Sequence, residues 1–110
     1  MTEKEKKFLS DIAYSIELIE NFTNGINSFE QYSKDIKTKG AVERHLGIIG
    51  EALNKFLKES TTNDVKNAVQ IISLRNRLIH SYDSVDDSII WSILIRHLRP
   101  LKEEINNKLK

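Results

Sequence analysis

Hydrophobic residues recur at intervals of three and four along most of the chain, the spacing that places them on one face of an α-helix. The first such run predicts a helix from about Thr2 to Phe22, and Asn24-Gly25 is typical of the turn that ends a helix. Ser28, followed three residues later by Gln31, predicts a capping box for a short helical turn. No segment alternates hydrophobic and polar residues as a half-buried strand does.

A longer helix is predicted from about Lys34 to Glu59. Its hydrophobic face consists of Val42, Leu46, Ile49, Leu53 and Phe56. Gly47 and Gly50 lie near its middle, where each glycine costs up to about 1 kcal/mol relative to alanine. We therefore expect a neighbouring helix to approach closely at both glycines. The polar segment 60–64 should form a loop and supply the next N-cap.

A third run carries Val65 near its start and ends near His80, and segment 82–88 turns the chain, with Ser84 or Asp86 as the next cap. Pro100 lies inside the last hydrophobic run and should kink or split that helix. These elements predict a single all-α domain over residues 1–110, folded as an up-and-down helix bundle. Phe56 and Trp91 are expected to be anchors of the core or of a dimer interface.

Composition narrows the chemistry. The 110 residues include no cysteine, which excludes disulfides, thiol nucleophiles and thiolate metal sites. No hydrophobic run approaches the roughly 20 residues of a membrane span, and the charged start does not resemble a secretory signal; we expect a cytoplasmic protein without membrane contact. The formal net charge is +1 with both signs interspersed, so any contact with nucleic acid must come from a local cluster.

Segment 75–82, Arg-Asn-Arg-Leu-Ile-His-Ser-Tyr, is that cluster. Arginine is a permanent cation shaped for phosphate, and histidine can move a proton near neutral pH. The segment therefore suits a site that holds or cleaves a phosphodiester without a metal or another cofactor. A structural interpretation stays open, because cations at a helix C-terminus also favour the helix dipole. His45 and His97 show no metal-ligand spacing and are expected to be structural.

Helical geometry separates these side chains. The step from Arg75 to His80 is about 140° around an ideal helix, whereas Asn76 and His80 share a face. Arg75 and His80 can meet one phosphate if the arginine reaches round, if the helix end loosens, or if a two-fold homodimer brings two copies together. Arg77 lies on another face and is expected to bind a surface acid. Tyr82, just past the helix, should line the mouth of the site.

Three segments of the chain resemble those of the HepT-like proteins, which are the toxin halves of HEPN/MNT toxin–antitoxin pairs. Residues 44–52 read RHLGIIGEA, residues 74–82 read LRNRLIHSY, and residues 86–101 carry an acid, aliphatic residues, a tryptophan and then Leu-Arg-Pro-Leu. Their order and the chain length also agree with the family. Ser73 and Ser81 depart from it, because glycine is common at both positions.

The resemblance implies a four- or five-helix HEPN domain that dimerises and carries a metal-independent ribonuclease site. Arg75 and His80 match the family's catalytic pair, and Asn76 matches the polar residue that follows the arginine. The partner of such proteins, an MNT-type nucleotidyltransferase antitoxin, inactivates them by transferring AMP to the motif tyrosine, which is Tyr82 here. Glu51 is expected either to point into the cleft, pairing with Arg75 or tuning His80, or to lie on a solvated helix face.

Arg44 could point into the cleft in the same way, and the pattern favours this less strongly than for Glu51.

Two function classes remain open. One is a ribonuclease toxin that cleaves RNA. The other is a non-catalytic helical partner, or nucleotide-binding subunit, of a minimal nucleotidyltransferase.

Overall fold

The computed structural model describes residues 1–60 and 64–110, and every regular element in these ranges is helical. The all-α prediction is therefore confirmed. The elements are α1 (Glu3–Phe22), α2 (Phe29–Lys34), α3 (Ile36–Glu59), α4 (Val69–His80), the 3₁₀ turn η1 (Tyr82–Ser84), α5 (Asp87–Arg96) and α6 (Leu98–Leu109). Of the loop predicted at 60–64, residues 61–63 lie outside the described residues.

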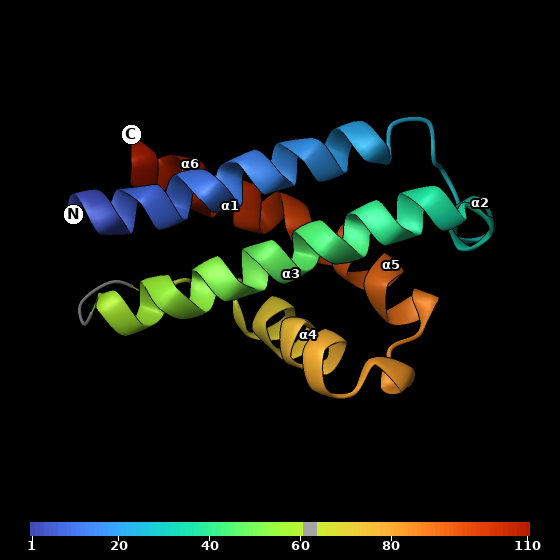
Figure 1. The fold of residues 1–110 in the computed structure, drawn as a ribbon. Coiled ribbons are helices and arrows are strands. Elements are labelled where there is room, and N and C mark those ends of the chain that lie inside the picture. The colour runs from blue at the N-terminus through green and yellow to red at the C-terminus, as the bar shows by residue number, and fades with distance from the viewer. Residues whose placement is uncertain (61–63) are drawn as a thin grey trace.

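The two long helices, α1 and α3, pack along each other and organise the bundle (Figure 1). Helix α4 packs against α3, while α6 packs against α1. Helix α5 leads into α6 and contacts the short α2. The N- and C-termini lie at the same end of the molecule (Figure 1). Helix α3 is thus the central element, with α1 and α4 both packed on it.

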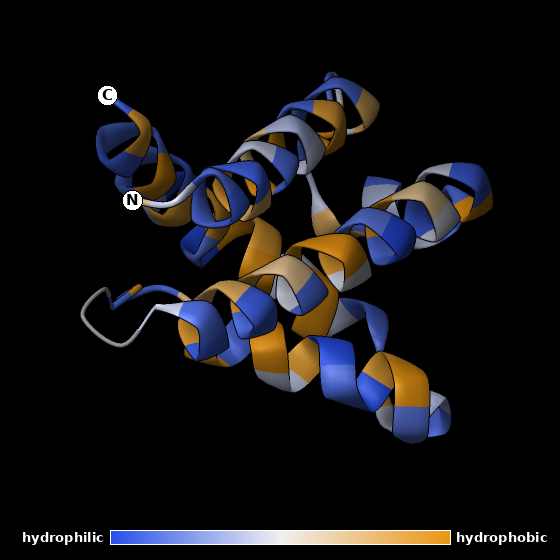
Figure 2. Ribbon diagram, turned by 60° about the vertical axis from the view of Figure 1, so that its left-hand side comes forward, coloured by the Kyte–Doolittle hydropathy of each residue, from blue (hydrophilic) through white to orange (hydrophobic). Residues whose placement is uncertain are grey.

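The hydrophobic faces of the helices meet in one core, and hydrophilic residues cover much of the outside (Figure 2). The predicted face of α3 is completely buried, as are four residues of α1: Leu9, Ile12, Ile16 and Ile19. Phe56 belongs to this core as predicted. Trp91 is partly buried and packs beside Tyr32, with the ring centroids 5.7 Å apart.

Local hydrogen bonds explain where the first two helices begin. Thr2 and Glu5 form a complete capping box at the start of α1. Ser28 accepts a hydrogen bond from the Gln31 backbone at 3.2 Å, but the Gln31 side chain accepts from the Asn27 N–H at 2.6 Å. The predicted second box is therefore only half formed, because Gln31 reaches one residue further back than Ser28.

Helix α4 begins at Val69, four residues later than the Val65 of the predicted run. A contact with α6 explains why α4 begins later than predicted. The Glu104 carboxylate accepts hydrogen bonds from the backbone N–H groups of Lys66 and Asn67 at 2.8 and 3.2 Å. Those N–H groups are held in a turn ahead of the helix.

The last predicted helix is split into α5 and α6 at His97, three residues before Pro100. Proline has no N–H to donate to the Arg96 carbonyl, and its ring crowds that carbonyl, so the break precedes it. Asp86 caps α5 by accepting from the Ile89 N–H at 3.1 Å. Ser84, the other candidate cap, instead donates its hydroxyl to the Ser81 carbonyl. Within the described ranges no helix has the length and hydrophobicity to cross a membrane.

Candidate functional site

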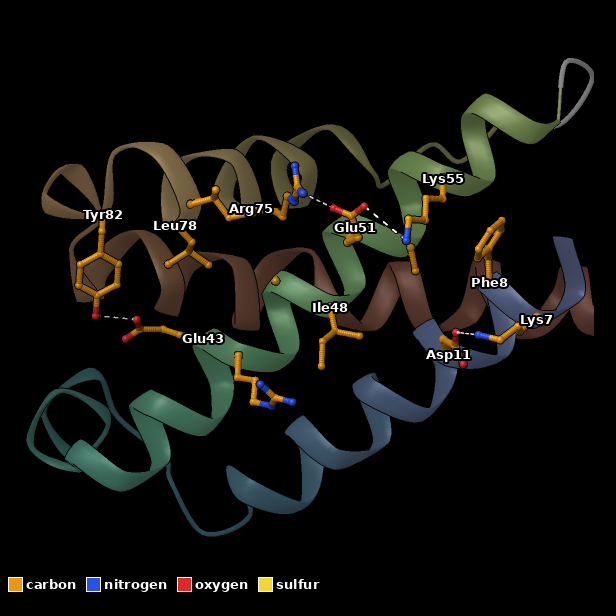
Figure 3. A pocket seen from close by; sticks show the side chains of 14 residues that line it. Lys7, Phe8, Asp11, Glu43, Ile48, Glu51, Lys55, Arg75, Leu78 and Tyr82 are labelled. Carbon is orange, nitrogen blue, oxygen red and sulfur yellow. Dashed lines mark hydrogen bonds and ion pairs between the residues drawn. The ribbon is translucent and has the colours of Figure 1, made fainter. Parts of the chain in front are cut away.

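A groove of about 650 Å³ runs between α1, α3 and α4 (Figure 3). Its walls are largely hydrophobic, with Phe8 from α1, Ile48 from α3 and Leu78 from α4. Charged side chains from α3 and α4 project into it, and Tyr82 closes one end. A cleft of this size with a few polar groups is typical of a ligand site.

The close approach of α3 and α4 depends on Gly50. A Cβ added there would lie 2.4 Å from the Cβ of Arg75 and 3.1 Å from the Ile71 carbonyl oxygen. The prediction of a close approach is confirmed at Gly50 and wrong at Gly47, where an added Cβ would meet nothing within 4 Å. Gly47 instead faces the groove. The absent side chain at Gly50 therefore lets Arg75 cross directly over α3.

Arg75 is held by its neighbours inside this groove. Its guanidinium forms an ion pair with Glu51 and donates a hydrogen bond to the Asn76 side-chain oxygen at 3.0 Å. The side chain is only 20% exposed, and its Nε is buried without a hydrogen-bond partner among the described residues. The sequence left two positions open for Glu51, and the structure has it paired with Arg75. These two contacts leave further N–H groups of the guanidinium for another acceptor.

Glu51 lies between two cations, because the Lys55 ammonium is also 3.7 Å from its carboxylate (Figure 3). An incoming phosphate must therefore compete with Glu51 for Arg75. Arg44 lines the same groove but is exposed.

His80 stands apart from this arrangement. It is the last residue of α4, is exposed, and does not line the groove. Asn76 is likewise exposed on the outer side of α4. One protomer therefore brings Arg75, Glu51 and Tyr82 into a single groove and leaves His80 outside it, as expected from the angular separation of Arg75 and His80.

Tyr82 lies in η1, is 59% exposed and lines the end of the groove. Its hydroxyl donates a hydrogen bond to the Glu43 carboxylate at 2.8 Å (Figure 3). This hydrogen bond, together with the negative charge of Glu43, raises the pKa of Tyr82 above its ordinary value. Sequence reasoning missed Glu43. The available signal was its spacing of four and seven residues from Gly47 and Gly50, which places all three along one stripe of α3.

Arg77 was expected to bind a surface acid, and this is wrong. Its guanidinium donates to the Ser84 hydroxyl at 3.1 Å and to the Ser84 carbonyl oxygen. The hydroxyl of Ser88 holds the pKa of the Asp86 carboxyl below its usual range, and the charge of Arg77 adds a smaller effect. Arg77 therefore fixes the turn that carries Tyr82 and stays out of the groove.

The remaining histidines have structural surroundings. The His45 ring lies 3.2 Å from the Ser15 hydroxyl and packs beside Phe22, and burial lowers the pKa of His45. His97 lies at the junction of α5 and α6. Across residues 1–60 and 64–110, no three metal-binding side chains gather in one place.

Comparisons with known proteins identify the family. Residues 12–107 match the sequence profile of the family described as ribonuclease HepT-like. The chain is 38% identical over 108 residues to a probable ribonuclease HepT of Thermococcus cleftensis, with 93% of each chain covered. It is 36% identical over 107 residues to a putative RNase of Methanocaldococcus jannaschii, with 96% of this chain and 87% of the relative covered.

A putative RNase of Caldanaerobacter subterraneus is 31% identical over 106 residues, with 96% of this chain and 94% of that relative covered. No solved structure matches the chain. The matches to these three relatives cover most of each chain. The chain belongs to the HepT-like ribonuclease family.

Proposed function

We propose that this protein is a metal-independent endoribonuclease whose RNA-cleaving site forms in the cleft of a homodimer. It would act as the toxin of a HEPN/MNT toxin–antitoxin pair. The observation that carries the proposal is the groove lined by Arg75, whose guanidinium has N–H groups beyond those that contact Glu51 and Asn76. The family, and relatives described as ribonucleases, support the same reaction class.

Cleavage of RNA without a metal requires three functions. A base removes the 2′-hydroxyl proton, a cation stabilises the crowded phosphorane, and an acid protonates the leaving 5′-oxygen. Arg75 is the cation, and the Asn76 amide orients it through their hydrogen bond. His80 serves as acid or base, since an imidazole exchanges protons near neutral pH.

The second copy supplies what one protomer lacks. His80 lies outside the groove that contains Arg75, so in our proposal a two-fold axis brings His80 of the partner subunit to that groove. Ile79 favours such an interface, because it is 56% exposed and lies beside Leu78 at the edge of the groove. Each dimer would then contain two equivalent sites.

Control of the activity is assigned to Tyr82. An MNT-type nucleotidyltransferase antitoxin would transfer AMP to its exposed hydroxyl. Each added nucleotide brings negative charge and bulk to the end of the groove, where it competes with an RNA phosphate for Arg75.

Cleavage of labelled RNA in excess EDTA tests the reaction. We expect the wild type to cut, His80→Ala to lose about 10²–10⁴-fold in rate, and Arg75→Ala to lose about 10²–10³-fold. Arg96→Ala, which removes an exposed cation on α5 that does not line the groove, is the matched control and should cleave normally. Equal cleavage by the wild type and both site variants would contradict the proposal.

Mixing the two inactive variants tests the shared site. A mixed dimer of Arg75→Ala and His80→Ala protomers contains one doubly altered site and one intact site. Random reassortment makes about half of the dimers mixed, so about a quarter of the wild-type activity should return. If each protomer carried a complete site of its own, mixing would restore nothing.

The ion pair between Arg75 and Glu51 favours a second candidate, because it leaves the guanidinium largely neutralised. In that alternative the chain is a non-catalytic helical or nucleotide-binding subunit of a minimal nucleotidyltransferase. It predicts no RNA cleavage, a stable complex with the transferase, and a rise in melting temperature when nucleotide is added. The cleavage assay in EDTA separates the two candidates.

A further inference from the structure

We infer that Glu43 is the general base for nucleotide transfer to Tyr82, accepting the phenolic proton as the Tyr82 oxygen attacks the nucleotide. The inference rests on the proposed AMP transfer and extends it. The residue that activates the modified tyrosine would then belong to the chain being modified. The transferase would need to bring only the nucleoside triphosphate and align it.

The geometry supplies the first argument. The Tyr82 hydroxyl donates to Glu43 Oε1 at 2.8 Å, across 39 positions of sequence and from a different element. This distance lies within the range that a general base needs to take a proton. Figure 3 shows the two side chains turned towards each other at the end of the groove. Tyr82 as a whole is more than half exposed, so a second protein can approach it.

The chemistry supplies the second argument. As the Tyr82 oxygen bonds to the α-phosphorus of ATP, the bond from that phosphorus to the bridging oxygen of the β-phosphate breaks and pyrophosphate leaves. The phenolic proton must depart in the same event, and it passes to the Glu43 carboxylate. A carboxylate held at hydrogen-bond distance is a suitable acceptor for that proton.

The resting state of Tyr82 supplies the third argument. Its pKa is raised, first by the hydrogen bond to Glu43 and then by the charge of that carboxylate, with Asp87 of α5 adding a smaller effect. Asp87 itself is paired with Lys39 at 3.0 Å. The phenol is therefore protonated at neutral pH, and a reactive phenolate forms only if a base removes the proton during the attack.

The substitution Glu43→Gln removes the proposed base but keeps the hydrogen-bond geometry. The amide oxygen can still accept the Tyr82 hydrogen bond, but it cannot take the proton. The assay measures AMP incorporation from ATP by a purified MNT-type nucleotidyltransferase of the kind proposed as the antitoxin, as initial rates from pH 7 to 9.5. At pH 7 we expect Glu43→Gln to be modified about 10²-fold or more slowly than wild type. The deficit should shrink as the pH rises towards the ordinary tyrosine pKa of about 10, because the phenol then loses its proton without Glu43.

Taking the ratio of the two rates at each pH removes the transferase's own pH dependence. Asp83→Asn is the charge control, since it removes a negative charge next to Tyr82 without a hydrogen bond to its hydroxyl. It should be modified at the wild-type rate, and Tyr82→Phe should take up no AMP.

The outcomes are distinct. Equal rates for Glu43→Gln and wild type, a faster Glu43→Gln, or a deficit that stays constant with pH would each overturn the role of Glu43 while leaving the AMP transfer standing. An equal slowing by Asp83→Asn would also overturn it, because charge would then explain the effect. A wild-type chain that takes up no AMP would overturn both proposals.

Discussion

Gly47 and Gly50 are on the same helix, three residues apart, and alanine should act on them in opposite directions. In a helix interior, alanine is more favourable than glycine by up to about 1 kcal/mol. At Gly47 nothing lies within 4 Å of the added methyl group, so Gly47→Ala should keep that gain. We expect this variant to be about 0.5–1 kcal/mol more stable than the wild type.

At Gly50 the same methyl group would lie 2.4 Å from the Cβ and 2.9 Å from the Cγ of Arg75. The Cβ is fixed to the backbone and cannot move without moving α4, and the Cγ can move only by a change of rotamer. Overpacking of this kind typically costs about 1–3 kcal/mol. Because both variants share the intrinsic helix gain, Gly50→Ala should be about 1–3 kcal/mol less stable than Gly47→Ala.

Urea and thermal unfolding followed by circular dichroism measure the difference. For a domain of this size, 1 kcal/mol corresponds to roughly 4 °C in melting temperature. Gly50→Ala should also lower RNA cleavage in the proposed reaction, because it displaces Arg75 from Glu51. Equal stability of the two alanine variants would refute the close approach of α4 to α3 at Gly50.

Two further predictions concern stability. Burial lowers the pKa of His45, so its neutral form is favoured in the folded state and stability should fall as the pH drops below its ordinary value near 6.5. In urea titrations between pH 7.5 and 5, His45→Gln should lose that part of the pH dependence. Glu104→Ala should destabilise by about 1–3 kcal/mol, because it frees two backbone N–H groups. Glu103→Ala, which removes only an exposed pair with Arg99, should change stability by less than about 0.5 kcal/mol in the same assay.

The helices were predictable because burial imposes a local period. Leu46, Leu53 and Phe56 lie on one face of α3 wherever the neighbouring helices are placed. Their spacing in the sequence is therefore enough to indicate the helix and its buried side. Asp86 could be named as a cap for a similar reason, since a capping side chain bonds backbone only a few residues away.

Contacts between elements that are distant in the sequence were harder to predict from the sequence. The late start of α4 depends on Glu104, which lies far along the chain. The hydrogen bond between Glu43 and Tyr82 joins α3 to η1 and leaves no local pattern. Gly47 and Gly50 look equivalent in sequence, because which of them faces α4 depends on how α3 is rotated in the bundle.

The pairing of charges in the groove bears on how the proposed reaction could proceed in a chain of net charge +1. Lys7 pairs with Asp11, while Lys55 and Arg75 share Glu51. Arg44 adds a fourth cation to the groove, but Glu43 adds a third carboxylate, so a phosphate at a distance meets little net positive charge and gains little long-range attraction. Binding energy arises only when the phosphate reaches Arg75 and takes the place of Glu51. Such a site favours brief engagement of RNA over stable binding, and that is what a cleaving enzyme requires.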